Sequence, residues 1–458
     1  MREPLYPDAI VVVPGVMGSE LIDEQNRQLW GLNPAQLARA WVTGGYDGLS
    51  IRRGFDPSDT GVRATRLLRV PAYMPFLGGL EPYGRILRHL QALWDPRAVL
   101  EFPYDWRLPA ASHGTALAEA AQVHLLRWRD TVRAARPDID ADGIKLVVVA
   151  HSMGGLVTLA ALSTPGFSEI IRRVISLGTP YFGSVNALST LADGGELPHI
   201  FPHRAARDLA RTCPGVYDLL PRYVCVTEGD GRLLSPNDVQ AIGASYELAA
   251  DAADRWERLG LREPGYRVPL SAIVGIDQPT FASFRLSGHR LELFESALDD
   301  DPDAGGDGTV PRRCASPLGV EASGYNVRHG ALARADSVLR AVNDILLQRS
   351  TGPRLDVRPL SAEFPHLPLA GHALEVRVRE VGEIGRDPGA SAFGIAVTSE
   401  DLATNKIRQW RIAKPRPIDG GSLVFTVDGL PPHLHRITVD GGGSPLTEII
   451  LVAREEQG

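Results

Sequence analysis

Cysteine is scarce in this sequence, and no apolar run is long enough to cross a bilayer. The 458 residues include three cysteines, an odd number that cannot form a complete disulfide framework. We therefore expect reduced thiols at Cys213, Cys225 and Cys314. The N-terminal segment MREPLYPDAI lacks the apolar stretch of a signal peptide, which predicts a cytoplasmic protein.

Basic residues are outnumbered by acidic ones. The sequence has 48 Lys and Arg against 55 Asp and Glu, a formal net charge of −7 at pH 7. A surface of this sign does not attract polyanions, so we expect no nucleic-acid partner and only local, apolar contact with lipid. Ligand spacings typical of zinc or calcium sites are also lacking, and we predict no metal and no cofactor.

The strongest positive signal is an apolar run that ends at a serine. In KLVVVAHSMGG, residues 146–149 predict a buried parallel strand, and the apolar residues from Leu156 onward predict a helix. Ser152 lies in the turn between them, the setting that exposes a nucleophilic hydroxyl. The strand and helix nearly touch at Ala150 and Gly154, so both residues must be small; alanine replaces the usual glycine at the first position.

A nucleophilic serine needs a base and an acid, which in this type of fold follow it in the order acid, histidine. His329, in NVRHGALARAD before a helical pattern, is the expected general base. Asp307, in the glycine-flanked loop GGDGTVP, is the preferred acid. Asp277 is the alternative, because it directly follows the apolar strand 270–276; it could equally open the turn before Pro279.

A second apolar strand, residues 10–13, leads into the loop PGVMGS. Backbone N–H groups of such a loop can stabilise a developing oxyanion. We predict that Val16 supplies one donor and Met153, directly after the serine, the other, with Met17 as the fallback for Val16.

Six motifs occur in order along the chain: PGVMGSEL, PYDWRL, AHSMGG, SLGTPYFGS, GDGTVP and the late His329. Together they resemble the lecithin:cholesterol acyltransferase-like family over about residues 8–348. The resemblance implies an α/β-hydrolase core with cap insertions over a lipid-binding cleft. It also implies that Ser152, Asp307 and His329 form the triad and that Val16 and Met153 form the oxyanion hole.

Changes of pattern predict two domains. Residues 1–349 are expected to form the α/β-hydrolase domain, with cap insertions at about 20–80 and 185–267. A proline-punctuated linker, 350–368, leads to short alternating segments in 369–458, which predict a β-sandwich with the immunoglobulin-like fold as the candidate.

Candidate substrate contacts lie in two segments near the N-terminus. Met17, within the predicted oxyanion loop, and Tyr73 and Phe76, in the apolar cluster YMPFL, are predicted to contact substrate. Burial in the core is the alternative for this cluster. If the cluster faces lipid instead, the caps would touch a membrane surface transiently.

The sequence as a whole predicts a serine hydrolase that cleaves lipid or phospholipid esters through an acyl-enzyme. An acyltransferase that uses an alcohol acceptor is the first alternative. The alternative of another class is a non-catalytic scaffold that binds a protein partner, or a second copy, through the C-terminal β domain. That domain could equally do no more than pack against the core.

Overall fold

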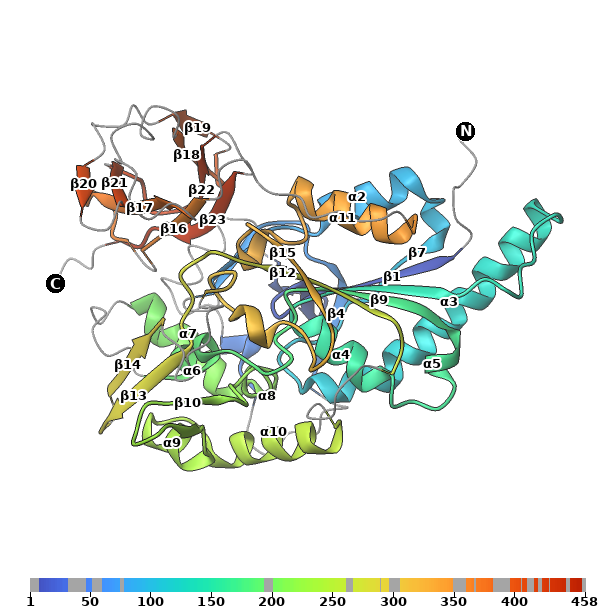
Figure 1. Ribbon diagram of the computed structural model, residues 1–458, viewed down its shortest axis with the longest axis horizontal. Helices are drawn as coiled ribbons and strands as arrows, with labels where there is room; N and C mark the ends of the chain where they lie inside the picture. The colour runs from blue at the N-terminus through green and yellow to red at the C-terminus, as the bar shows by residue number, and fades with distance from the viewer. Residues whose placement is uncertain are drawn as a thin grey trace.

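A six-stranded parallel sheet lies at the centre of the computed structural model (Figure 1). The structure describes residues 8–31, 47–51, 60–74, 78–192, 201–260, 267–288, 290–295, 305–348, 360–365, 368–381, 396–404, 406–409, 416–418, 422–427, 429–441 and 445–454. The strand order is β15-β12-β9-β8-β1-β7, and every neighbouring pair is parallel. These strands are β1 (Ala9–Val13), β7 (Val99–Glu101), β8 (Leu146–His151), β9 (Ile171–Leu177), β12 (Leu270–Gly275) and β15 (Ala322–Tyr325).

Helices cover both faces of this sheet, which explains why β1 and β8 are buried at every position and are rich in valine (Figure 1). Helices α2 (Gly84–Leu93) and α11 (Asp336–Leu346) lie on one face. Helices α3 (Gly114–Ala135), α4 (Met153–Ala161) and α5 (Phe167–Ile170) lie on the other. Short 3-10 turns are η1 (Asp47–Leu49), η2 (Pro96–Ala98), η3 (Ala110–His113), η4 (Arg312–Cys314) and η5 (His329–Ala331). The core therefore has the α/β-hydrolase architecture that the sequence predicts.

The first insertion forms small antiparallel sheets beside the core. Strands β2 (Ser19–Asp23), β3 (Gln28–Trp30) and β4 (Val62–Leu67) make a sheet of order β3-β2-β4. Strands β5 (Ala72–Met74) and β6 (Gly78–Leu80) pair as a hairpin. Residues 75–77, which include Phe76, lie outside the described part of the chain.

The second insertion builds a cap of helices around another sheet. Its elements are α6 (Val185–Leu191), α7 (Phe201–Thr212), α8 (Pro214–Tyr217), β10 (Val224–Val226), β11 (Arg232–Leu233), α9 (Pro236–Ala241) and α10 (Tyr246–Arg258). The cap sheet, of order β11-β10-β13-β14, also takes up β13 (Ser283–Ser287) and β14 (Arg290–Phe294). The predicted cap boundary at residue 267 omits this hairpin, because β13 pairs with β10 across a long gap in sequence.

The C-terminal part contains two antiparallel four-stranded sheets that share one apolar core. Their orders are β16-β17-β21-β20 and β19-β18-β22-β23. The strands are β16 (Leu360–Glu363), β17 (Leu374–Glu380), β18 (Ala396–Asp401), β19 (Lys406–Gln409), β20 (Arg416–Ile418), β21 (Ser422–Val427), β22 (Leu434–Asp440) and β23 (Leu446–Leu451). Lettered in chain order with one added strand after C, the sheets read A-B-E-D and C′-C-F-G, an immunoglobulin-like arrangement.

One strand of this sandwich lies where the sequence predicts a linker. Leu360, Ala362 and Phe364 alternate with polar residues and are buried in the sandwich core, so residues 360–363 form the edge strand β16. The prolines on either side hide this short alternation, and the predicted linker 350–368 is therefore too long. No helix in the described residues is long and apolar enough to span a membrane.

Candidate active site

Ser152 lies in a strained turn between β8 and α4. Its backbone has φ 52° and ψ −127°, a region that side-chain-bearing residues rarely adopt. A Cβ on Gly154 would lie 2.4 Å from the carbonyl oxygen of Pro14, so the chain leaving the turn passes too close to β1 for a larger residue. Gly154 must therefore be small, but the reason is its contact with the end of β1 and with Pro14 rather than the expected contact between the entering strand and the leaving helix.

The structure brings Ser152, His329 and Asp307 together in one chain of hydrogen bonds. Ser152 Oγ lies 2.9 Å from His329 Nε2, and His329 Nδ1 lies 2.6 Å from Asp307 Oδ2. All three residues are less than a tenth exposed. With Nδ1–H donating to the carboxylate, Nε2 is the ring atom that accepts the serine proton.

The carboxylate of Asp307 is held by its own loop. Its Oδ1 accepts the backbone N–H groups of Thr309 (2.9 Å) and Val310 (2.7 Å), which leaves Oδ2 for the imidazole. Asp277, the alternative acid, also follows β12, but its Oδ2 lies 3.4 Å from Asn326 Nδ2 and makes no hydrogen bond to His329. The acid that contacts the histidine is thus Asp307.

The predicted oxyanion loop is fixed by bonds along its length. Tyr104 Oη donates to the carbonyl of Pro14 (2.9 Å), and Trp30 Nε1 donates to that of Met17 (2.8 Å). Met17 has φ 63°, a left-handed conformation. Val16 and Met17 line the space next to Ser152, while Met153 opens helix α4 directly after it. Such rigid support is what a preorganised donor pair requires.

A buried relay that the sequence does not reveal connects this loop to the histidine. The Gly15 N–H donates to Tyr83 Oη (2.8 Å), Tyr83 O–H donates to His151 Nδ1 (2.7 Å), and His151 Nε2–H donates to the carbonyl of His329 (3.1 Å). Burial, together with the proximity of His329, lowers the pKa of His151 to about 3. His151 is therefore neutral, and with Nε2–H donating to His329 O, its Nδ1 accepts from Tyr83.

Gly178 is a second feature of the site that sequence reasoning did not single out, although it lies in the motif SLGTPYFGS. Its φ is +60°, and a Cβ there would lie 2.5 Å from Leu332 and close to both Asp307 Oδ2 and His329 Nδ1. A side chain at this position would displace the pair. The positive φ and the tight contact explain why glycine occurs there.

A small pocket opens at the serine, which we call the serine pocket. It is lined by Val16, Met17, Gly79, Leu80, His151, Ser152, Pro180, Ser184, Ala187, Leu219, Thr309, Val310, His329 and Gly330. Its volume is about 30 Å³, space for roughly two water molecules. Tyr73 does not line it: its ring is 3% exposed within the core, as the packing alternative expects. Phe76 lies outside the described residues.

The cap holds the acid loop from one side. Ser184 Oγ donates to the carbonyl of Thr309, and Asn186 Nδ2 donates to that of Gly308 at 3.2 Å. Both donors belong to the start of α6, where Ser184 is also the N-cap.

The C-terminal sandwich holds both the acid and the base loops from another side. Arg328, next to His329, forms an ion pair with Glu448 of β23 and donates to the carbonyl of Ala362 at 2.9 Å. The Gln278 side chain donates to Leu360 O (2.9 Å) of β16, while its backbone pairs with Gly306 beside Asp307.

A buried carboxylate adds to the contact between the sandwich and the core. Glu81, which is 2% exposed, pairs with Arg436 of β22 at 2.5 Å and with Arg334 at 2.7 Å. The sandwich is therefore packed against the site rather than tethered at a distance.

The cysteines are free thiols buried in the protein, and burial raises the pKa of Cys213, Cys225 and Cys314 to about 12. Among the described residues, no three His, Cys, Asp or Glu side chains converge as a metal-binding group would require.

Fold and site geometry together define an α/β-hydrolase fold that carries a Ser–His–Asp constellation. The predicted resemblance is confirmed over part of the chain: residues 79–261, which are 183 of the 458, match the family model described as lecithin:cholesterol acyltransferase. No curated protein matches the sequence.

Solved structures resemble the chain at low identity. A structure described as the Tle4–Tli4 complex matches at 13% identity and TM-score 0.46, covering 74% of this chain and 98% of that one. The lipase BlEst2 of Bacillus licheniformis matches in its propeptide form at 13% identity and TM-score 0.38, covering 98% of this chain and 75% of that one. Its mature form matches at 15% identity and TM-score 0.36, covering 76% and 94%.

Proposed function

We propose that the protein is a serine hydrolase of lipid esters. Ser152 Oγ attacks the ester carbonyl while His329 Nε2 takes its proton, and Asp307 stabilises the resulting imidazolium. The backbone N–H groups of Val16 and Met153 stabilise the tetrahedral oxyanion. His329 then protonates the leaving alcohol, which yields an acyl-enzyme that water, activated by the same imidazole, hydrolyses to the free acid.

The observation that carries this proposal is the hydrogen-bonded chain from Ser152 through His329 to Asp307. It coincides with a left-handed backbone at the serine and with a pocket at its hydroxyl. A protein that only binds a partner has no physical need for this combination, because strain at a turn persists only where the surrounding structure enforces it.

The substrate class is supported by the match of residues 79–261 to the lecithin:cholesterol acyltransferase family model. The net charge of −7 disfavours electrostatic attraction to an anionic bilayer, so contact with a lipid surface is expected to be local and apolar.

A fluorophosphonate probe tests the chemistry directly, because it reacts with an activated serine and not with an ordinary one. We expect the full-length protein to be labelled and Ser152→Ala to remain unlabelled. Ser189→Ala is a matched control, since Ser189 is a buried serine of the cap whose hydroxyl donates within its own helix. If neither the wild type nor the control is labelled, the protein is better described as a binding scaffold.

Acyl transfer to an alcohol is the second candidate, because the matching family model is described as an acyltransferase. Both reactions share the acyl-enzyme and differ only in the acceptor. Incubation with a mixed lipid extract, with and without an added long-chain alcohol, and analysis by mass spectrometry distinguishes them. Free fatty acid in both samples supports the hydrolase, and a new alkyl ester supports the transferase.

A further inference from the structure

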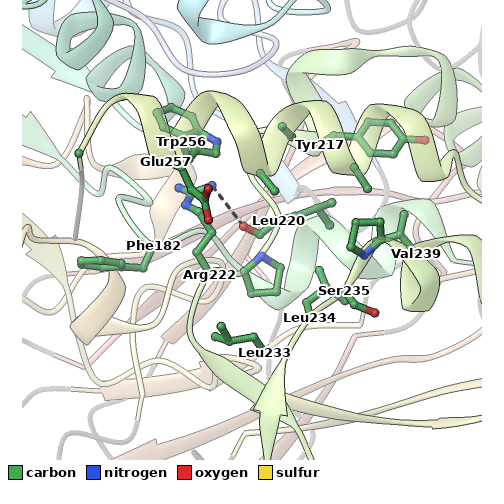
Figure 2. Close-up of a pocket in the computed structure, with 16 residues that line it drawn as sticks. Phe182, Tyr217, Leu220, Arg222, Leu233, Leu234, Ser235, Val239, Trp256 and Glu257 are labelled. Carbon is green, nitrogen blue, oxygen red and sulfur yellow. Dashed lines mark hydrogen bonds between the residues drawn. The ribbon is translucent and has the colours of Figure 1, made fainter.

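The cap contains a second, much larger cavity beside the site. It has a volume of about 350 Å³, within the roughly 300–1,000 Å³ typical of small-molecule sites. Figure 2 shows its wall, which includes Phe182, Leu220, Leu233, Val239 and Trp256. We call it the cap cavity.

Polar groups in this wall are already engaged by the protein. Tyr217 Oη donates to Arg211 O at 3.0 Å, and Ser235 Oγ donates to Asp238 Oδ2 at 2.6 Å. Glu257 is exposed, where water solvates its charge. A ligand would therefore gain little from directional polar contacts here and would be held by burial of apolar surface.

The guanidinium of Arg222, which also lies in the wall, is engaged by the protein through both Nη atoms, while its buried Nε has no hydrogen-bond partner among the described residues. Arg222 donates to the carbonyls of Asp218 and Tyr181, each at 2.9 Å, and to that of Leu220 at 3.4 Å, the bond drawn in Figure 2. Its charge also lies over the Trp256 ring, 4.5 Å from the centroid. Several carbonyl dipoles and an aromatic face already stabilise this cation, so it does not require an anionic ligand.

Two short segments contribute residues to both the cap cavity and the serine pocket. In segment 180–184, Pro180 and Ser184 line the serine pocket while Phe182 lines the cap cavity. In segment 217–222, Leu219 faces the serine pocket and Leu220 the cap cavity. The two segments are joined by Arg222 and by Ser184 N–H, which donates to Leu219 O at 2.9 Å.

We propose that the cap cavity binds an uncharged apolar acyl chain. The serine pocket is too small for such a chain, whereas the adjacent cavity has the volume and the apolar wall that it needs. Each methylene moved from water into an apolar site tightens binding about fourfold. The chain is that of the ester under attack or a second chain bound alongside; the link to ester cleavage rests on the proposed function, but binding itself does not.

Helix α10 provides variants that change the cavity and a control that does not. Ala252 is buried in the cavity wall, so Ala252→Leu adds three carbons to the space. Ala253 lines the same cavity but is exposed, so Ala253→Leu narrows it without disturbing the core. Ala250 lies on the same helix and is not part of the wall, which makes Ala250→Leu the matched control.

Binding is measured in a Ser152→Ala background with methyl cis-parinarate, an uncharged ester whose fluorescence rises in apolar surroundings. We expect Ala252→Leu to raise its Kd at least tenfold, Ala253→Leu several-fold, and Ala250→Leu less than twofold. Equal Kd values for folded Ala252→Leu and Ala250→Leu would overturn the proposal. If Ala252→Leu does not fold, the comparison of Ala253→Leu with Ala250→Leu decides.

A second measurement, in proteins that retain Ser152, identifies which chain binds. Suppose the cavity holds the chain of the ester under attack. Ala252→Leu then lowers kcat/KM for p-nitrophenyl decanoate about tenfold and leaves the butyrate unchanged. If the cavity holds a second chain, the ratio of the two values stays constant while parinarate binding is lost. Absence of any hydrolysis by the wild type contradicts the proposed function alone.

Discussion

The cap and the C-terminal sandwich both hold the loops of the Ser–His–Asp site, but they do so with different interactions. On the cap side, neutral side chains bond to backbone carbonyls, as Asn186 does to Gly308. The sandwich side also has neutral bonds, as from Gln278 to Leu360 O, but it adds largely buried ion pairs. These pairs are Arg328–Glu448 and Arg436–Glu81. Neutral hydrogen bonds are little affected by salt and pH, whereas carboxylate pairs are lost when the carboxylate is protonated.

The cap and the sandwich also differ in whether they lie within the part of the chain that matches the family model. Asn186 lies within residues 79–261, the part of the chain that matches the family model, whereas Glu448 and Arg436 lie far outside it. The reacting groups are thus supported partly by a domain that the family pattern does not include.

The largest effect is expected where the contacts from both sides converge, at the acid loop. Asp307→Asn cannot hold Nδ1–H of His329 in the required tautomer, and we expect kcat to fall about 10⁴-fold. Asp277→Asn is the control, because that carboxylate makes no hydrogen bond to His329 and its loss should cost little. Turnover of p-nitrophenyl esters measures both. Equal losses of kcat in the two variants would show that the hydrogen bond between Asp307 and His329 does not identify the catalytic acid.

The next largest effect is expected on the sandwich side. Glu448→Gln leaves Arg328 largely buried without its partner, which should lower the free energy of unfolding by about 3 kcal/mol. Glu292→Gln removes one partner of an exposed pair with Arg285 in the cap sheet, and a change below about 0.5 kcal/mol is expected. Urea unfolding of both variants provides the measurement. Similar values for the two would remove the proposed contrast between the two sides.

A third prediction concerns His151, which faces Tyr83 and His329 and belongs to neither side. Its pKa is about 3 in the folded protein and near 6.5 when unfolded. Between these two pH values the unfolded chain binds a proton at His151 and the native state does not. Its contribution to stability is therefore intact above pH 6.5 and is lost as pH falls.

Between pH 6.5 and 4.5, the wild type should lose about 2 kcal/mol more stability than His151→Asn. Carboxylates of the sandwich contact titrate in both proteins, so the difference between the two unfolding profiles isolates the histidine. Parallel profiles for the two proteins would mean that His151 accepts a proton in the native state.

The smallest effect is expected on the cap side. Asn186→Ala removes one neutral hydrogen bond to Gly308 O, and a loss of about 1 kcal/mol is expected in urea unfolding. Because no ion pair is involved, this loss should be the same at low and high ionic strength. If the loss of unfolding free energy in Asn186→Ala depends clearly on salt, the cap contact is electrostatic like the sandwich contact, and the contrast between the two is wrong.

The central features of the fold and site follow from local sequence patterns. The valine-rich strand before Ser152, the glycine-flanked Asp307 and the late His329 each carry a signal that is short in sequence and specific in chemistry. The structure joins all three with hydrogen bonds, and the carboxylate bonded to His329 is that of Asp307, whereas position alone favoured Asp277.

The features that the sequence did not predict depend on pairings between distant residues. Strand β13 joins β10 across an intervening helix pair and a core strand, and β16 is an edge strand only because β17 lies beside it. The Tyr83–His151 relay spans 68 residues and uses two side chains with no motif of their own. Local periodicity contains no information about such contacts, which tertiary packing decides.

The closest packing between sandwich and core bears on the order in which the protein is made. A Cβ on Gly79 would lie 2.3 Å from Ile449, and a Cβ on Gly330 would lie 1.7 Å from Gly79 O, so three backbones stack beside His329. Ile449 leaves the ribosome long after Ser152, Asp307 and His329. Since domains generally fold as they emerge during synthesis, a nascent chain carries every reacting group before it has the strand that supports them, and full activity should appear only after β23 has been made.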